Sequence, residues 1–119
     1  MTDRDIIGNY RELFDLSRDV TTTQMMYGFQ GVGPGWLAIM DRLCARLQAI
    51  AGPEFKFTSV KEKMGTLRIS YRCGCDEVEA VVEAAKAEAQ GTCMICGKAR
   101  QLREREGCWT VRCGRCAVE

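Results

Sequence analysis

The sequence predicts a small α+β domain followed by a C-terminal, zinc-ribbon-like module held by four cysteines. Apolar residues recur at three- and four-residue steps over three segments, as on the buried face of a helix. They alternate with polar residues in the stretch 66–72, as in a half-buried strand. Two Cys-x-x-Cys pairs follow near the C-terminus. We expect the α+β domain to span residues 1–90 and the module residues 91–119.

Composition is that of an ordinary globular protein. The chain has 119 residues and a formal net charge of +1, with 46% hydrophobic and 28% charged residues. No apolar run reaches the ~20 residues that cross a bilayer, and the N-terminal Met-Thr-Asp-Arg-Asp lacks the pattern of an export signal. We therefore expect a cytoplasmic protein without membrane association. In such a reducing compartment, its eight cysteines favour metal binding over disulfides.

The first helix is expected over residues 3–16. Ile6, Tyr10 and Leu13 share one face there, and Thr2 or Asp3 caps the start.

A long loop is expected between this helix and the next, because residues 17–35 include three successive threonines and Gly33-Pro34-Gly35. Four apolar residues of this loop are candidate partner-binding residues: Met25, Met26, Tyr27 and Phe29. The alternative, which we favour, is that they pack onto the core as a plug.

The second helix is expected over residues 36–50, with an apolar stripe from Trp36 to Ile50. Cys44 lies close to this stripe. We interpret it as a small buried apolar residue, since the chain has no histidine to activate a thiol.

A hairpin is expected over residues 55–72, with strands 55–61 and 66–72. Leu67, Ile69 and Tyr71 share one face of the second strand, whereas the first strand loses its alternation, which predicts a bulge or register change near Thr58. A third helix is expected over residues 76–90. Asp76 followed by Glu79 resembles a capping box, and Gly91 ends the helix.

The four cysteines Cys93, Cys96, Cys113 and Cys116 have the number and spacing of a structural zinc site, with sixteen residues between the pairs. A closed four-thiolate site leaves the metal no open position for chemistry. A thioredoxin-like redox centre fits less well, because Cys93 follows a helix end instead of preceding a helix. Three other cysteines are candidates to supplement either pair or to hold a second metal, but we expect one zinc with these three as reduced bystanders: Cys73, Cys75 and Cys108.

Basic residues of the hairpin and the module suggest a surface that binds anions or nucleic acid. The candidate contacts are Lys56, Lys63, Arg68, Arg72, Arg103 and Arg105. Catalysis finds little support, because the chain lacks histidine, a phosphate-binding glycine loop and a Gly-x-Ser-x-Gly motif.

Three stretches of the chain carry a family pattern: Tyr27 to Cys44, Val60 to Tyr71 and Cys93 to Lys98. Together they resemble a family of small uncharacterised proteins of bacteriophages and bacterial mobile elements, which pair a Gly-Trp helix with a VKEKFGxLRFY-like hairpin and a C-terminal CxxC zinc knuckle. Met64 stands where the family usually has phenylalanine. The resemblance implies this organisation and a bacterial or phage-infected cell, but no activity.

The leading expectation is a non-enzymatic, zinc-stabilised protein of phage or mobile-element origin that binds another protein, a host or defence component. Nucleic-acid binding through the basic hairpin and ribbon is the alternative, and an enzyme of unrecognised type is third. The oligomeric state stays open.

Overall fold

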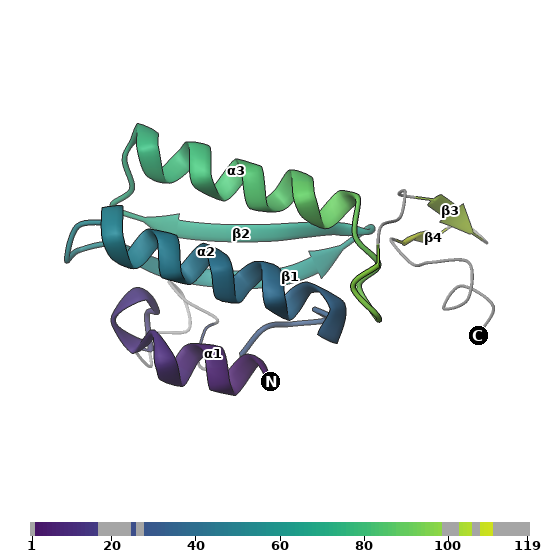
Figure 1. Ribbon diagram of the computed structural model, residues 1–119, viewed down its shortest axis with the longest axis horizontal. Helices are drawn as coiled ribbons and strands as arrows, with labels where there is room; N and C mark the ends of the chain where they lie inside the picture. Colours follow the sequence, from purple (N-terminus) through teal and green to yellow (C-terminus); the bar gives the residue numbers. More distant parts are fainter. Residues whose placement is uncertain (1, 17–24, 26–27, 99–102, 106–107, 111–119) are drawn as a thin grey trace.

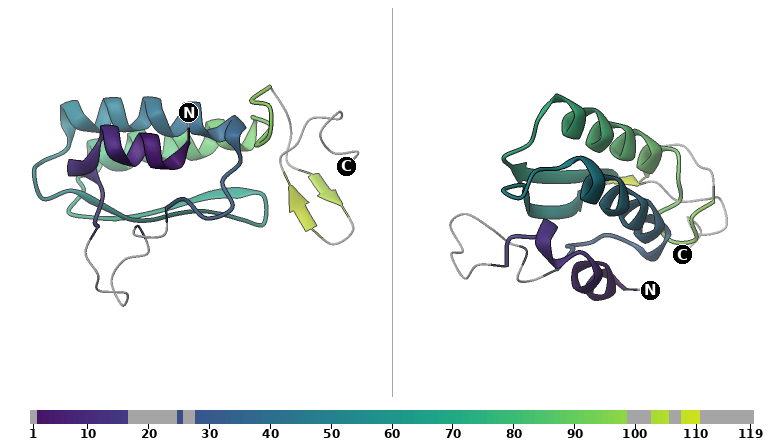
Figure 2. Two further views of the ribbon diagram at one scale, coloured as in Figure 1. Left: turned by 90° about the horizontal axis from the view of Figure 1, so that it is seen from below. Right: turned by 60° about the vertical axis from the view of Figure 1, so that its left-hand side comes forward.

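The computed structural model describes residues 2–16, 25, 28–98, 103–105 and 108–110. Helices α2 (Leu37–Ile50) and α3 (Asp76–Gln90) cover one face of an antiparallel hairpin of β1 (Lys56–Lys63) and β2 (Thr66–Arg72), and α1 (Asp3–Asn9) lies beside α2 (Figures 1 and 2). This arrangement confirms the α+β class. A second hairpin pairs β3 (Arg103–Arg105) with β4 (Cys108–Thr110). None of the described helices is long and apolar enough to cross a membrane.

Helix α1 is shorter than predicted. Thr2 caps it in a capping box: the Asp5 N–H donates to Thr2 Oγ1 at 3.2 Å, and the Thr2 N–H donates to Asp5 Oδ2 at 2.9 Å. The helix ends at Asn9, and after a 3₁₀ turn the chain is extended at Phe14. The prediction of a helix to residue 16 was therefore wrong. Glycine and asparagine at 8 and 9 weaken the helix, and Phe14 instead bridges to β1.

The central hairpin has the predicted irregularity. Phe57 pairs with Tyr71 and Ser59 with Ser70, so the register shifts between Phe57 and Ser59, as a bulge at Thr58 requires. The loop contains only Met64 and Gly65, with φ of 55° and 77°. The first strand thus extends beyond the predicted residue 61 to Lys63.

The core lies between the helices and the hairpin, and its centre is aromatic. Phe57 is fully buried, with its ring centroid 5.0 Å from those of Phe14 and Phe55. Cys44 is also fully buried, as predicted, and burial together with the nearby Asp41 carboxylate raises the pKa of its thiol to about 12. The thiol therefore stays protonated and contributes as an apolar group.

Helix α3 has the predicted limits but not the predicted cap. Cys75 occupies the N-cap position and makes no side-chain cap hydrogen bond, so Asp76 is the first helical residue and cannot form a capping box with Glu79. That prediction was wrong because Cys73, at φ 61°, turns the chain so that extended backbone at Cys75 leads straight into the helix. The acidic first turn still interacts favourably with the helix dipole.

Candidate metal centre

The first cysteine pair lies on a tight turn directly after α3. The Cys93 N–H donates to the Lys98 carbonyl at 2.7 Å, and the Gly97 N–H donates to the Cys93 carbonyl at 2.9 Å. Gly97 has a φ of 81°, a conformation that costs glycine little but a side-chain-bearing residue ~1–2 kcal/mol. We call residues 92–98 the cysteine turn. It brings Cys93 and Cys96 to one short loop, as a Cys-x-x-Cys metal ligand pair requires.

The cysteine turn is anchored to the segment that leads into α2. The Gly35 N–H donates to the Met94 carbonyl at 2.8 Å, and Trp36 Nε1–H donates to the Thr92 carbonyl at 2.9 Å. A Cβ on Gly35 would lie 2.1 Å from the Cys93 carbonyl oxygen, and one on Gly33 equally close to the Met94 carbonyl oxygen. Both positions therefore require glycine because two backbones touch there.

This anchoring role escaped the sequence analysis, which assigned Gly33 and Gly35 only to a loop. Alternating glycines immediately before a tryptophan were the available signal. Glycine is used where two backbones approach closely as well as in turns.

The two sulfur-bearing residues of the turn differ in exposure. Cys93 is fully buried, whereas Cys96 is exposed. Cys113 and Cys116, the other two predicted ligands, lie outside the described residues. Among the residues that the structure describes, no three metal-ligating side chains gather in one place. A four-thiolate site would therefore need the second pair.

Cys73 and Cys75 lie at the opposite end of α3 from the cysteine turn. Both are exposed, and they connect β2 to the start of the helix (Figure 1). The fifteen residues of α3 span about 22 Å, far more than the ~2.3 Å of a zinc–sulfur bond allows. These two cysteines cannot share one tetrahedral site with Cys93 and Cys96. Cys108 begins β4, for which the structure describes only the backbone pairing.

The predicted anion-binding residues of the hairpin divide into two groups. Lys56 donates to the Glu12 carbonyl, and Arg72 forms a 2.7 Å ion pair with the buried Asp15. These two side chains hold the segment after α1 against the sheet. By contrast, Arg68 is exposed and hydrogen-bonds to Thr66 Oγ1 at 2.8 Å, and Lys63 is exposed near the hairpin tip.

Arg68 also lies directly opposite Lys61, which the sequence analysis did not single out. Like charges in opposing positions repel each other, so this pair marks the sheet face turned away from the helices as a place where an anion would be favourable. Arg103 and Arg105 lie at the two ends of β3, and their side chains are outside the description.

The candidate partner-binding residues of the loop are buried wherever the structure describes them. Met25 is fully buried and Phe29 is 8% exposed, and the Phe29 N–H donates to Asp3 Oδ2 at 3.0 Å. This burial agrees with the plug interpretation. Met26 and Tyr27 lie outside the described residues.

Searches of the sequence against protein-family models and curated proteins, and of the fold against solved structures, find no match. Function must therefore be argued from the residues and geometry above.

Proposed function

We propose that the chain is a zinc-stabilised, non-enzymatic protein that acts by binding another protein, as a bacteriophage or mobile-element factor directed at a host or defence component. The main observation in favour of a zinc site is the anchored cysteine turn. Its backbone is held by Gly35 and Trp36, so an ion bound there would tie the C-terminal residues to the start of α2. The ion then serves as a structural cross-link.

A non-enzymatic role is supported by the chemistry of the side chains. The chain contains no histidine. The thiol of the buried Cys44 has a pKa raised to about 12 and stays protonated near neutral pH, so it is a poor nucleophile. Cysteines committed to zinc are likewise unavailable for chemistry.

Metal analysis of the purified protein tests the zinc site. We expect one zinc per chain, lost in Cys96→Ser and Cys113→Ser but retained in the matched control Cys73→Ser. Absence of stoichiometric metal from protein purified without chelator would refute the site. Retention of the zinc in all three variants would place the ligands elsewhere, and equal loss in all three would show that the effect is not specific to the predicted ligands.

Affinity capture from a bacterial host lysate tests the protein-binding role. The metal-loaded chain should retain a specific protein, identified by mass spectrometry, that resin without the chain does not retain. If the metal-loaded chain captures no protein, or if it turns over a substrate and a substitution that preserves folding abolishes the turnover, the proposal is wrong.

Nucleic-acid binding is the second candidate, favoured by the opposed Lys61 and Arg68 on the exposed sheet face. The triple variant Lys61→Gln, Lys63→Gln and Arg68→Gln removes this charge without disturbing the ion pair of Arg72 with Asp15. A mobility shift of single-stranded DNA or RNA that falls with salt and disappears in this variant would support the candidate. No shift at low salt would exclude it.

A further inference from the structure

The two edges of the central hairpin differ. The outer edge of β1 is hydrogen-bonded: the Asp15 N–H donates to the Phe57 carbonyl at 3.0 Å, and Gln30 exchanges two bonds with Val60 and Glu62 at 2.9 and 2.8 Å. Within the described residues, the outer edge of β2 has no comparable backbone partner. The described part of the chain thus closes one side of the sheet and leaves the other open.

The hairpin register identifies the groups along this open edge. Antiparallel residues alternate between bonding their partner strand and directing N–H and C=O away from it. The two-residue loop makes Lys63 and Thr66 a bonded pair, so Thr66 and Arg68 face β1 whereas Leu67 and Ile69 face outward. The outward N–H and C=O groups of Leu67, Ile69 and, by the same alternation, Tyr71 therefore line the edge. No proline, bulge or lysine of β2 protects it.

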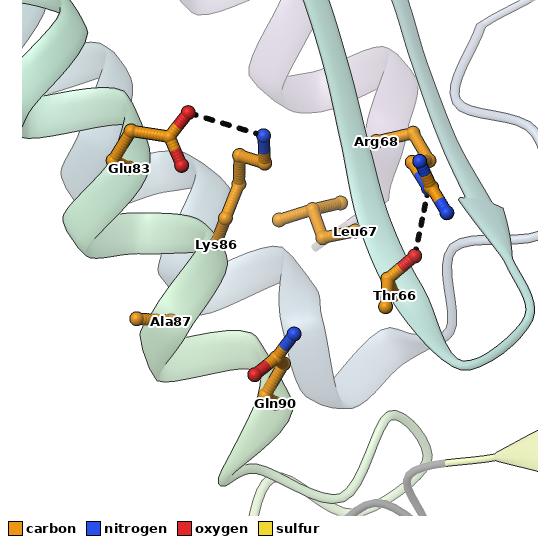
Figure 3. Close-up of a pocket in the computed structure, with 7 residues that line it drawn as sticks. All are labelled: Thr66, Leu67, Arg68, Glu83, Lys86, Ala87 and Gln90. Carbon is orange, nitrogen blue, oxygen red and sulfur yellow. Dashed lines mark hydrogen bonds and ion pairs between the residues drawn. The ribbon is translucent and has the colours of Figure 1, made fainter.

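A groove lies beside this edge. It encloses about 430 Å³ and opens between β2 and the C-terminal half of α3 (Figure 3). Leu67 is buried at its base, and Lys86 extends from α3 toward β2 while pairing with Glu83 at 3.3 Å. The complete lining is Thr66, Leu67, Arg68, Glu83, Lys86, Ala87 and Gln90.

We propose that an extended segment of a partner protein pairs with the outer edge of β2 in this groove and adds a third strand to the sheet. The inference rests on the protein-binding function above and names the surface and the kind of partner. Backbone hydrogen bonds supply the attachment in such strand addition, and alternate side chains supply the specificity.

The alternation of a strand determines which side chains the groove selects. A residue opposite Arg68 points to the same sheet face as Arg68, where an acidic side chain forms a cross-strand ion pair. Residues opposite Leu67 and Ile69 point toward α3, where Leu67, Ala87 and the methylene stem of Lys86 favour apolar groups. Lys86 pairs with Glu83 in the groove, so the net positive charge beside the edge is that of Arg68, on the sheet face turned away from α3. The preferred segment therefore has an acidic residue between two apolar ones.

A second copy of the chain does not fit as the added strand. Self-pairing would bring the copy's own α3 to the same edge, where α3 already lies along β2 (Figures 1 and 3). Paired strands lie about 4.8 Å apart, whereas packed helices need about 8–10 Å. The groove accommodates an isolated strand but not a second helix-covered edge.

Titration of the isotope-labelled, zinc-loaded full chain with two short capped peptides tests the inference by amide NMR. One peptide contains Thr-Val-Glu-Val-Thr and the other Thr-Val-Lys-Val-Thr. The Glu peptide should shift the amides of Leu67 and Ile69 saturably and bind about fivefold more tightly than the Lys peptide. Arg68→Glu should reverse this preference, whereas the control Lys63→Glu, whose side chain lies outside the groove, should keep it.

Ile69→Pro provides the backbone test, because it removes an outward N–H that the hairpin does not use. It should weaken both peptides while the chain keeps its zinc and its remaining amide spectrum. Equal binding of the two peptides to the wild type, shifts that avoid Leu67 and Ile69, or a zinc-loaded chain that dimerises through this edge would overturn the inference. If a lysate partner still binds Arg68→Glu and Ile69→Pro at full strength, the protein-binding function stands and this surface is wrong.

Discussion

Met64 combines an unfavourable backbone conformation with an exposed side chain. Its φ is 55°, and together with Gly65 at 77° it forms a two-residue hairpin loop in which both residues need positive φ. The side chain is 58% exposed, so its packing offsets little of the free-energy cost of the backbone conformation. Asparagine is the residue that such a position prefers besides glycine.

Met64→Asn should therefore stabilise the fold. We expect the free energy of unfolding, measured by urea denaturation, to rise by about 0.5–1 kcal/mol. Met64→Ala is the control, because it removes the same exposed side chain without easing the backbone. If the two variants prove equally stable, the left-handed conformation is not the source of the strain.

Cys44 makes stability depend on pH in the alkaline range. Its pKa is about 12 in the folded chain against an ordinary 9.0, because burial and the Asp41 carboxylate disfavour the thiolate. Below pH 9 both states keep the proton. Between pH 9 and 12 only the unfolded state releases it, so stability falls as pH rises, by up to about 1.4 kcal/mol per unit.

Cys44→Ala should remove this part of the fall. Tyr10 and Tyr71, whose pKa values are also raised chiefly by burial, remain in the variant and contribute to both proteins. Urea unfolding at about pH 8 and about pH 10.5 should show the wild type losing more stability than the variant. Parallel losses would mean that the thiolate is tolerated in the core.

At the level of elements, the contact between the cysteine turn and the start of α2 matters most. Gly35 brings its backbone against the turn so closely that a Cβ added there would lie 2.5 Å from the Gly97 nitrogen, and Trp36 satisfies the Thr92 carbonyl. An element that the sequence assigns to the C-terminal module is thus held by the middle of the chain. A single methyl group added at Gly35 should therefore separate the cysteine turn from the start of α2.

Gly35→Ala is expected to lower the free energy of unfolding by about 2–4 kcal/mol, because backbone atoms cannot yield as side chains do. It should also weaken zinc retention under competition with a chelator. Gly8→Ala is the matched control. No atom lies within 4 Å of its added Cβ, and alanine in α1 should be neutral or stabilising by up to about 1 kcal/mol. Equal changes in the free energy of unfolding for the two variants would show that the close backbone approach at Gly35 does not determine stability.

At the level of the whole molecule, the proposed metal and the helix–hairpin core should be coupled. Removal of zinc should release the C-terminal residues, as metal-binding free energy is also folding free energy. Because Gly35 and Trp36 bond to the cysteine turn, the effect should spread to the start of α2, while β1 and β2 keep their shared core.

Hydrogen exchange with and without a chelator measures this coupling. The amides of Gly35, Cys93 and Gly97 should lose protection, whereas those of Lys61, which faces β2 in a bonded pair, and Leu43 should retain it. Uniform loss over the whole chain would mean that the core depends on the metal. Unchanged protection of the Gly97 amide would mean that the cysteine turn does not depend on the metal.

The sequence by itself determined the α+β class, α3 to the residue, the bulge near Thr58 and the burial of Cys44, because each follows from local periodicity or a local interruption of it. Tertiary structure alone decided the rest. Phe14 left the predicted helix to pair with β1, Arg72 was committed to Asp15, and Gly33 and Gly35 met the cysteine turn. It also separated Cys73 and Cys75 from Cys93, and among the described residues it left the edge of β2 open beside α3. These outcomes depend on contacts between residues distant in the chain, where the free energy gained by pairing or close packing exceeds local preference and leaves no periodic trace.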